Sequence, residues 1–153
     1  MTRARIAAVL ATAAAAAAVL ASGSPAASPK LYAFMDGEAE TRQGDTDGHA
    51  RIGFTFDRGA RRVCFDLRKF KLETPTRAHI HKGRKDKDGP IVVTLFEKPT
   101  GAGRGKVTGC ASNVPRTTID RILARPGDYY ANVHTATYPA GSVRGQLTTR
   151  KLV

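Results

Sequence analysis

Alternation of apolar and polar residues is the feature of this sequence that most restricts its fold. Between residues 31 and 149, short runs with a period of two are separated by Gly, Pro and Asp, and helical periodicity is confined to one short stretch. A period of two places successive side chains on opposite faces of an extended strand. The pattern therefore predicts an all-β domain, because the helices that a parallel α/β sheet needs between its strands are missing.

The clearest strands are predicted over residues 49–57 and 61–70. Each has one apolar face, formed by Ile52, Phe54 and Phe56 in the first strand and by Val63, Phe65 and Leu67 in the second. Further strands are predicted over 31–36, 77–82, 90–96, 128–135 and 142–149, and a short connecting helix is predicted around Ile119 and Ile122. About seven short strands at this spacing indicate an antiparallel β-sandwich or flattened barrel.

The first 27 residues differ in composition from the rest of the chain. Arg3 and Arg5 precede the uncharged run Ile6–Ala21, and small residues follow it. This is the layout of a secretory signal peptide, and the run is shorter than the ~20 apolar residues of a spanning helix. We expect residues 1–27 to be a signal peptide cut between 21 and 27, with an uncleaved anchor as the alternative.

The remaining residues, 28–153, are expected to form one exported β domain. No second long apolar run follows the signal peptide, so we expect no membrane span after cleavage. The protein is therefore expected to be secreted into the extracellular space, where it could also stay associated with the cell surface.

Two cysteines, Cys64 and Cys110, lie in this exported part. An even number of thiols in an oxidising compartment usually pairs, so one disulfide is expected, with a free thiol as the alternative. Residues 100–109 hold four glycines and are interpreted as a loop. Since Cys64 lies on the polar side of its strand, the disulfide is expected to attach this loop to the outside of the sheet.

Three of the four histidines fall in two predicted strands. His79 and His81 share one face of the first strand, and His134 lies on the polar face of the second, with Asn132 and Tyr130 as its polar surround. If the two strands are neighbours, three imidazoles converge and leave an open coordination position, a set that suits zinc or copper(II). The first interpretation of these histidines is that they are ordinary polar strand residues hydrogen-bonded to their neighbours, and the metal site is the alternative. His49 is interpreted as a surface residue, with a fourth ligand as the alternative.

The chain is strongly basic, with 25 Lys and Arg against 13 Asp and Glu and a formal net charge of +12. Four cations concentrate in the segment 82–90, namely Lys82, Arg84, Lys85 and Lys87. They are interpreted as a solvated surface, with a polyanion-binding surface as the alternative. The partner expected is an extracellular protein or an anionic wall polymer. Export and the lack of interleaved aromatic residues argue against genomic nucleic acid.

Catalytic motifs are absent from the sequence. It contains no Gly-x-Ser-x-Gly elbow, and its glutamates, among them Glu38, Glu40, Glu73 and Glu97, are scattered over segments interpreted as surface or strand ends. We therefore expect a protein that is not an enzyme.

Five blocks of the chain, in order and spacing, resemble the CHRD or chordin-type domain. They are residues 63–67 (VCFDL), 78–83 (AHIHKG), 89–95 (GPIVVTL), 127–135 (GDYYANVHT) and 139–147 (PAGSVRGQL). The family is named from an extracellular regulator that binds growth factors, and many bacterial members are exported single domains. The resemblance implies a secreted binding or structural module and no catalytic residues.

A looser similarity links the chain to copper-zinc superoxide dismutase. The matching positions are His79, His81, His134 and the pair Cys64 and Cys110, but the His- and Asp-rich zinc loop is missing. The fold expected is thus immunoglobulin-like or superoxide-dismutase-like. The function expected is a non-catalytic module, and the alternatives are a copper or zinc protein, with dismutase activity as its less favoured form, and a polyanion-binding protein.

Overall fold

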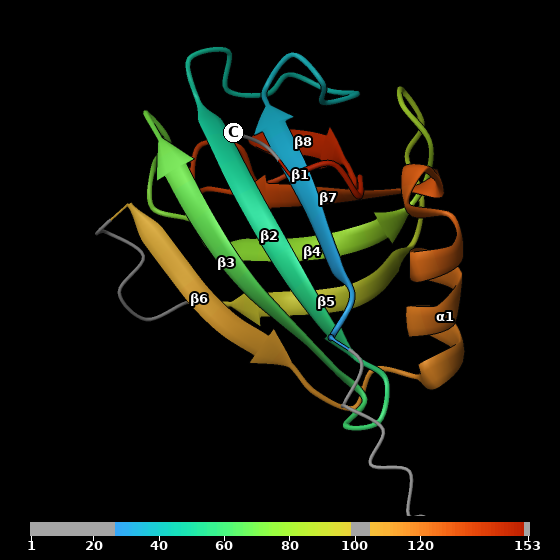
Figure 1. Ribbon diagram of the computed structural model, residues 1–153. Helices are drawn as coiled ribbons and strands as arrows, with labels where there is room; N and C mark the ends of the chain where they lie inside the picture. The colour runs from blue at the N-terminus through green and yellow to red at the C-terminus, as the bar shows by residue number, and fades with distance from the viewer. Residues whose placement is uncertain (1–26, 99–104, 152–153) are drawn as a thin grey trace, which may run out of the picture.

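The computed structural model describes residues 27–98 and 105–151. Eight antiparallel strands form one sheet in the order β5-β4-β7-β8-β1-β2-β3-β6. The sheet folds over into two crossing layers and makes a nearly closed sandwich (Figure 1). The strands are β1 (Lys30–Asp36), β2 (His49–Asp57), β3 (Arg62–Phe70), β4 (Arg77–Lys82), β5 (Ile91–Glu97), β6 (Lys106–Ala111), β7 (Tyr129–His134) and β8 (Val143–Gln146).

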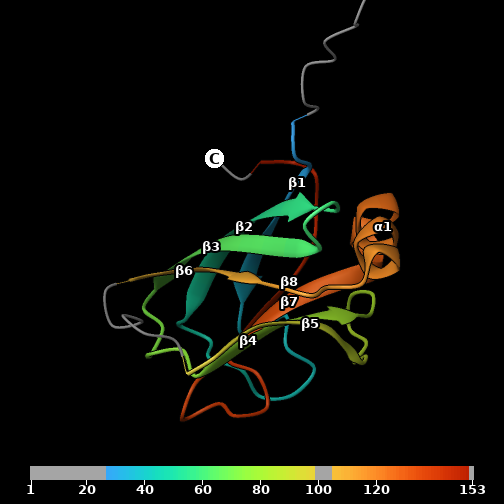
Figure 2. The same ribbon diagram turned by 90° about the horizontal axis from the view of Figure 1, so that it is seen from below.

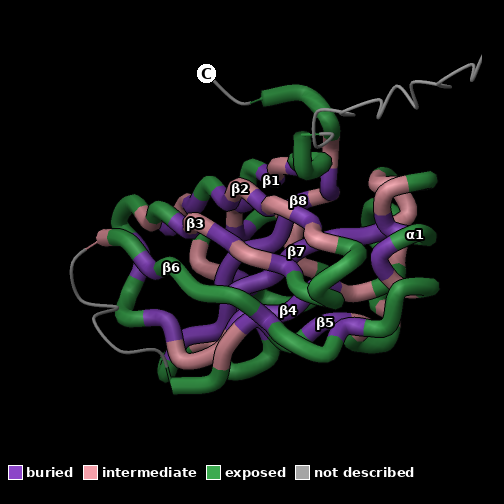
Figure 3. Tube along the Cα trace, turned by 60° about the horizontal axis from the view of Figure 1, so that its bottom comes forward, coloured by how far each residue is buried: buried purple, intermediate pink, exposed green. Residues whose placement is uncertain are grey.

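One layer holds β1, β2, β3 and β6, and the other holds β4, β5, β7 and β8, as the view from below shows (Figure 2). The apolar residues of the period-two pattern point between the layers, where the buried positions gather (Figure 3). Phe54, Phe56 and Leu67 from one layer and Ile80 and Val133 from the other are at most 1% exposed. The predicted alternation therefore describes the core correctly.

The predicted helix is present as α1 (Arg116–Ala124), which lies at one end of the sandwich (Figure 1). Ile119 and Ile122 are fully buried against the core, one turn apart on one face of the helix. A short 3-10 turn, Pro126–Asp128, leads from the helix into β7. The helix thus connects the two layers and closes the core at this end.

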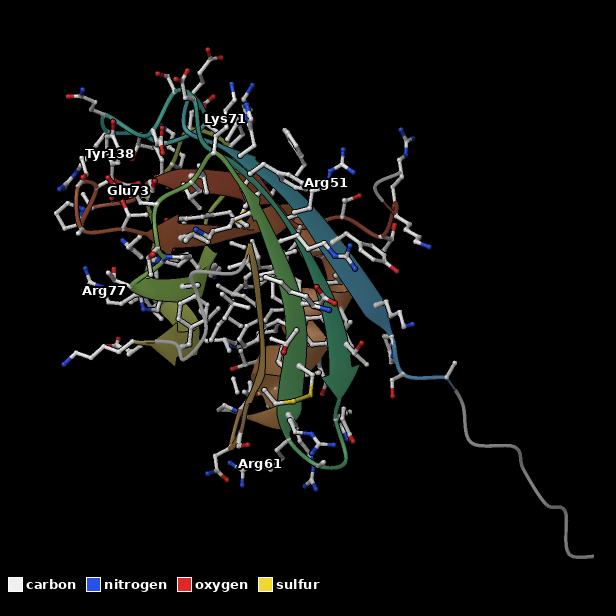
Figure 4. All side chains as sticks on the ribbon, turned by 90° about the vertical axis from the view of Figure 1, so that its left-hand side faces the viewer. Arg51, Arg61, Lys71, Glu73, Arg77 and Tyr138 are labelled. Carbon is white, nitrogen blue, oxygen red and sulfur yellow. A yellow bond between two sulfur atoms is a disulfide. The ribbon has the colours of Figure 1, made fainter. Side chains whose placement is uncertain are left out.

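All seven predicted strands are present, but the structure adds an eighth. β6 occupies part of the segment interpreted as a loop, and it pairs with β3 in register, with Cys64 directly opposite Cys110. The two cysteines form the expected disulfide, which Figure 4 shows in yellow. It therefore joins two paired strands, and the prediction that it attaches a loop to the sheet was wrong. The strand predicted over 142–149 is also shorter, because it ends at Gln146.

Three loops, residues 37–48, 83–90 and 135–142, contact the outer face of β4, β7 and β8 and cover it. We call them the cover loops. Every residue of β7 is consequently buried, although its polar residues point away from the core. Arg77 donates to the carbonyl of Pro139, and Glu73 accepts two hydrogen bonds from Thr137, so the third cover loop is held against the sheet (Figure 4). The polar face of β7 is thus buried beneath the cover loops, separate from the apolar core between the two layers.

The predicted signal peptide, residues 1–27, lies almost entirely outside the described residues. Within the ranges 27–98 and 105–151, no helix has the length and apolar character that crossing a membrane requires.

Candidate metal centre

The pairing of β4 with β7 brings the three strand histidines together. In this antiparallel pair Arg77 lies opposite His134 and His79 lies opposite Asn132, so His79 and His134 are diagonal neighbours on one face. His81 follows His79 on the same face of β4, while Ile80 between them points into the core and is fully buried. The two strands are therefore neighbours, which is the condition for the three imidazoles to converge.

Each of the three histidines directs one ring nitrogen to a common point. Nδ1 of His79 lies 3.1 Å from Nε2 of His134, and one donor atom from each ring, His81 included, lies within 4.8 Å of the others. At ligand distances of about 2.0–2.1 Å, two nitrogens of a tetrahedral site are about 3.4 Å apart. The nitrogens of His79 and His134 are therefore already close to that spacing.

The opposite nitrogen of each ring faces an oxygen that accepts hydrogen bonds. Nδ1 of His81 donates to the carbonyl of Gly89 at 2.9 Å, and Nδ1 of His134 donates to the carbonyl of Pro139 at 3.1 Å. Nε2 of His79 lies 3.7 Å from a carboxylate oxygen of Glu97. Because a carbonyl only accepts, the protons of His81 and His134 are placed on Nδ1, and their Nε2 lone pairs point inward.

This arrangement leaves an unpaired lone pair in the cluster. When the ring of His79 carries its proton on Nδ1, it donates to Nε2 of His134, but Nε2 of His81 is buried without a hydrogen-bond partner among the described residues. When the proton lies on Nε2, toward Glu97, all three inward nitrogens are bare acceptors. A cation bound by the three lone pairs satisfies them, and oxygen acceptors behind ligating histidines are the usual surround of such sites.

The ring of His81 is held by a stack of planar groups. It lies parallel to the Tyr130 ring, with centroids 4.8 Å apart and an interplanar angle of 7°, and the guanidinium of Arg144 lies on Tyr130. Gly89 accepts the hydrogen bond from the His81 ring. Only a glycine fits at this position, because a Cβ would collide with the backbone carbonyl of Lys82. The backbone of the second cover loop therefore approaches β4 closely enough to hold the His81 ring in place.

Burial favours the neutral form of two of the histidines, His79 and His134, by lowering their pKa values. It lowers the pKa of His134 to about 4, with the charge of a protonated His79 ring as a further cause, and it lowers the pKa of His79 as well, with His81 adding to the effect. A neutral imidazole is the form that binds a metal ion. Near neutral pH the cluster can therefore bind a cation without first losing protons from these two rings.

A pocket of about 200 Å³ opens beside the cluster, under the cover loops. Its wall includes His81, His134 and Asn132 from the strands and Glu40 and Ala140 from the loops. Oδ1 of Asn132 and Oε1 of Glu40 are buried and have no hydrogen-bond partner among the described residues. Two polar atoms without partners, from Asn132 and Glu40, therefore lie in the same pocket as His81 and His134.

Three residues of this region were not expected from the sequence. Glu40 and Glu97, interpreted as scattered surface residues, lie at the pocket and behind His79. Arg144 is 1% exposed and donates to the carbonyls of Arg84 and Lys87 and to the carboxylate of Asp88. The only sequence signal for it was its place in the Arg-Gly-Gln-Leu block, since its partners are more than 50 residues away along the chain.

The other predicted site residues lie apart from the cluster. His49 stands in β2 beside Phe34, with ring centroids 6.0 Å apart, and does not belong to the group of converging histidines. The four predicted polyanion-binding residues are exposed in and beside the second cover loop, namely Lys82, Arg84, Lys85 and Lys87. Arg84 forms an ion pair with Asp128 at 2.7 Å, and Asp86 and Asp88 reduce the positive charge of the loop. Polyanion binding stays a prediction.

Comparison with known proteins agrees with the sequence blocks. Searches among curated proteins and among solved structures give no match. The family model described as the CHRD domain matches residues 31–147, which run from the start of β1 to just past the end of β8 and include all three clustered histidines. Because this match covers most of the chain, the protein belongs to the CHRD domain family.

Proposed function

We propose that this protein is an extracellular CHRD domain that binds a copper(II) or zinc ion through Nδ1 of His79, Nε2 of His81 and Nε2 of His134. The role proposed is binding, without catalysis. Membership of the CHRD family and the disulfide between Cys64 and Cys110 are consistent with an extracellular protein.

One observation carries the proposal, namely that Nε2 of His81 and Nε2 of His134 both point as acceptors toward Nδ1 of His79. The outer nitrogens of His81 and His134 donate to the carbonyls of Gly89 and Pro139, so their inner nitrogens face each other as acceptors. A proton on Nδ1 of His79 can satisfy Nε2 of His134, but Nε2 of His81 then stays buried without a hydrogen-bond partner among the described residues. A buried acceptor without a donor costs about 1–3 kcal/mol, and a cation at this point removes that cost.

The donor set favours copper(II) and zinc over other ions. Three imidazoles suit both metals, whereas calcium and magnesium take oxygen ligands. At equal availability copper(II) binds such a site more tightly than zinc, following the general order of divalent metal affinities. The carboxylate of Glu97 behind His79 adds negative charge and so strengthens the binding of either ion.

Titration of the metal-free domain, residues 28–153 with the disulfide formed and without a histidine tag, tests the proposal. Calorimetry with copper(II) and with zinc is expected to give one ion per chain with a dissociation constant below about 1 μM, equivalent to roughly 8 kcal/mol. His134→Ala removes one ligand and is expected to abolish stoichiometric binding.

His49→Ala is the matched control, because it removes a half-buried strand histidine outside the cluster. It is expected to bind the metal as the unmodified protein does. Circular dichroism checks that both variants fold. Equal loss of binding in the two variants, or no saturable binding in the unmodified domain, would contradict the proposal.

A further inference from the structure

The pocket under the cover loops extends the metal centre. We infer that the bound ion keeps an open coordination position that faces this pocket, and that a small anion binds the ion there beside Asn132 and Glu40. This inference rests on the proposed metal site and adds to it a second ligand, together with the residues that receive it.

The position of the three histidines relative to the pocket supports the open face. His79 is 3% exposed, lies outside the pocket wall and closes the cluster from behind. His81 and His134 form part of the wall, so an ion held between the three rings has its free side on the pocket. Three protein ligands and one free position are the arrangement of zinc sites that exchange a ligand, whereas structural zinc sites have four protein ligands.

Asn132 provides an independent observation that the pocket receives a ligand. Its side chain is 4% exposed, lies on the wall of the pocket, and its Oδ1 has no hydrogen-bond partner among the described residues. Buried amides in folded proteins are almost always hydrogen-bonded, so an amide left free at a pocket wall indicates a partner that occupies the pocket. The amide carries both a donor and an acceptor, and it can turn its NH₂ group toward an anion.

The charges around the pocket favour an anion over a cation. A bound divalent ion is the largest charge in the site. Of the two carboxyl groups on the wall, Asp88 is paired with Arg144 at 3.3 Å. Burial raises the pKa of the other, Glu40, to about 7, so that in the metal-free protein this carboxyl group carries a proton over much of the range below neutral pH and can donate a hydrogen bond.

The size of the pocket restricts the ligand to a few non-hydrogen atoms. A cavity of about 200 Å³ accommodates several water molecules, at about 30 Å³ each, or a small inorganic or carboxylate anion. Azide is a suitable probe, because it is compact, binds copper(II) directly and produces a new charge-transfer absorption band when it does so.

Filling the pocket without touching the metal ligands tests the inference. Ala140 is exposed and lies on the pocket wall, whereas Ala136 is exposed in the same cover loop and is not part of the wall. Azide is titrated into the copper(II)-loaded protein, its Ala140→Trp variant and the Ala136→Trp control. Ala140→Trp is expected to weaken azide binding by about tenfold or more at nearly unchanged copper(II) affinity, and Ala136→Trp is expected to behave as the unmodified protein.

A second pocket-filling variant, Thr41→Trp, guards against misfolding of the first, because Thr41 lies on the opposite cover loop of the same pocket. Copper(II) binding without an azide band in the unmodified protein overturns this inference and leaves the proposed function standing. Equal azide affinities in the pocket-filling variants and the Ala136→Trp control also overturn it. Absence of copper(II) binding in the unmodified protein overturns both proposals.

Discussion

The guanidinium carbon of Arg144 lies 3.6 Å from the centroid of the Tyr130 ring, which in turn stacks on the ring of His81. The same guanidinium donates hydrogen bonds to the carbonyls of Arg84 and Lys87. One buried cation from β8 therefore connects the second cover loop to the ring of His81 in the histidine cluster.

Removal of the Arg144 guanidinium is expected to loosen both the second cover loop and the ring of His81. Arg144→Met keeps much of the side-chain volume but leaves two carbonyls without their donor, and it is expected to lower the free energy of unfolding by about 3 kcal/mol. Chemical denaturation of the metal-free protein measures the change. Arg51→Met, on the exposed outer face of β2 (Figure 4), is the control and is expected to change stability by less than about 0.5 kcal/mol.

Glu97 is expected to strengthen metal binding through His79. Glu97→Gln keeps the shape of the side chain but removes the negative charge 3.7 Å from Nε2 of His79, and is expected to weaken metal binding about tenfold. Calorimetric titration at constant pH and ionic strength measures the effect. Glu38→Gln removes an exposed carboxylate away from the pocket wall, and an equal weakening in this control would contradict a specific role for Glu97.

The carboxyl group of Glu40 is expected to make stability depend on pH. Burial raises its pKa from 4.5 to about 7, with nearby Asp88 also raising it and Arg144 opposing the rise. The unfolded chain therefore loses this proton at lower pH than the folded protein does. The contribution of Glu40 to the free energy of unfolding is full below pH 4.5 and falls as the pH rises to about 7, by on the order of 3 kcal/mol.

Glu40→Gln isolates this contribution from other titrating groups. Compared with the unmodified metal-free protein, the variant is expected to gain relative stability between pH 4.5 and pH 8, measured by denaturation at each pH. Asp47→Asn, in the same cover loop but exposed, is the control. A stability difference between Glu40→Gln and the unmodified protein that does not vary with pH would contradict the prediction.

The disulfide is expected to stabilise the sandwich at one of its edges. It joins residues 46 apart in the sequence, and a crosslink of this span lowers the entropy of the unfolded chain by the equivalent of about 4 kcal/mol. We expect the double variant Cys64→Ala, Cys110→Ala to lose about this much stability and to exchange the amide hydrogens of β6 faster. Unchanged protection of β6 would show that its pairing with β3 suffices without the disulfide.

The sequence predicted the strands whose two faces differ in polarity. Phe54 and Phe56 alternate with polar residues because one side of β2 faces the core and the other faces solvent. β6 escaped prediction because Gly109 stands between its two buried residues, Val107 and Ala111, and interrupts the alternation. This segment is a strand because it pairs with β3, although its own residues do not alternate in polarity.

The candidate site was predictable only in part, for a similar reason. His79, His81 and His134 could be identified because period-two geometry places them on one face of two strands. The pocket could not, since it arises where loops far apart in the chain lie over that face. Neither Glu40 nor Arg144 belongs to a local pattern that indicates burial. Contacts that only the folded chain makes bury Arg144 and half-bury Glu40.

The distance along the chain between the clustered histidines would couple the proposed metal binding to folding. His79 and His134 are separated by 55 residues, so their nitrogens meet only after β4 has paired with β7. An unfolded chain does not offer the three-histidine site, so an ion bound there would add to the stability of the folded domain. At a free metal concentration one hundred times the dissociation constant, this gain is about 2.7 kcal/mol. The metal content of the surroundings would then set how long the domain resists unfolding and proteolysis.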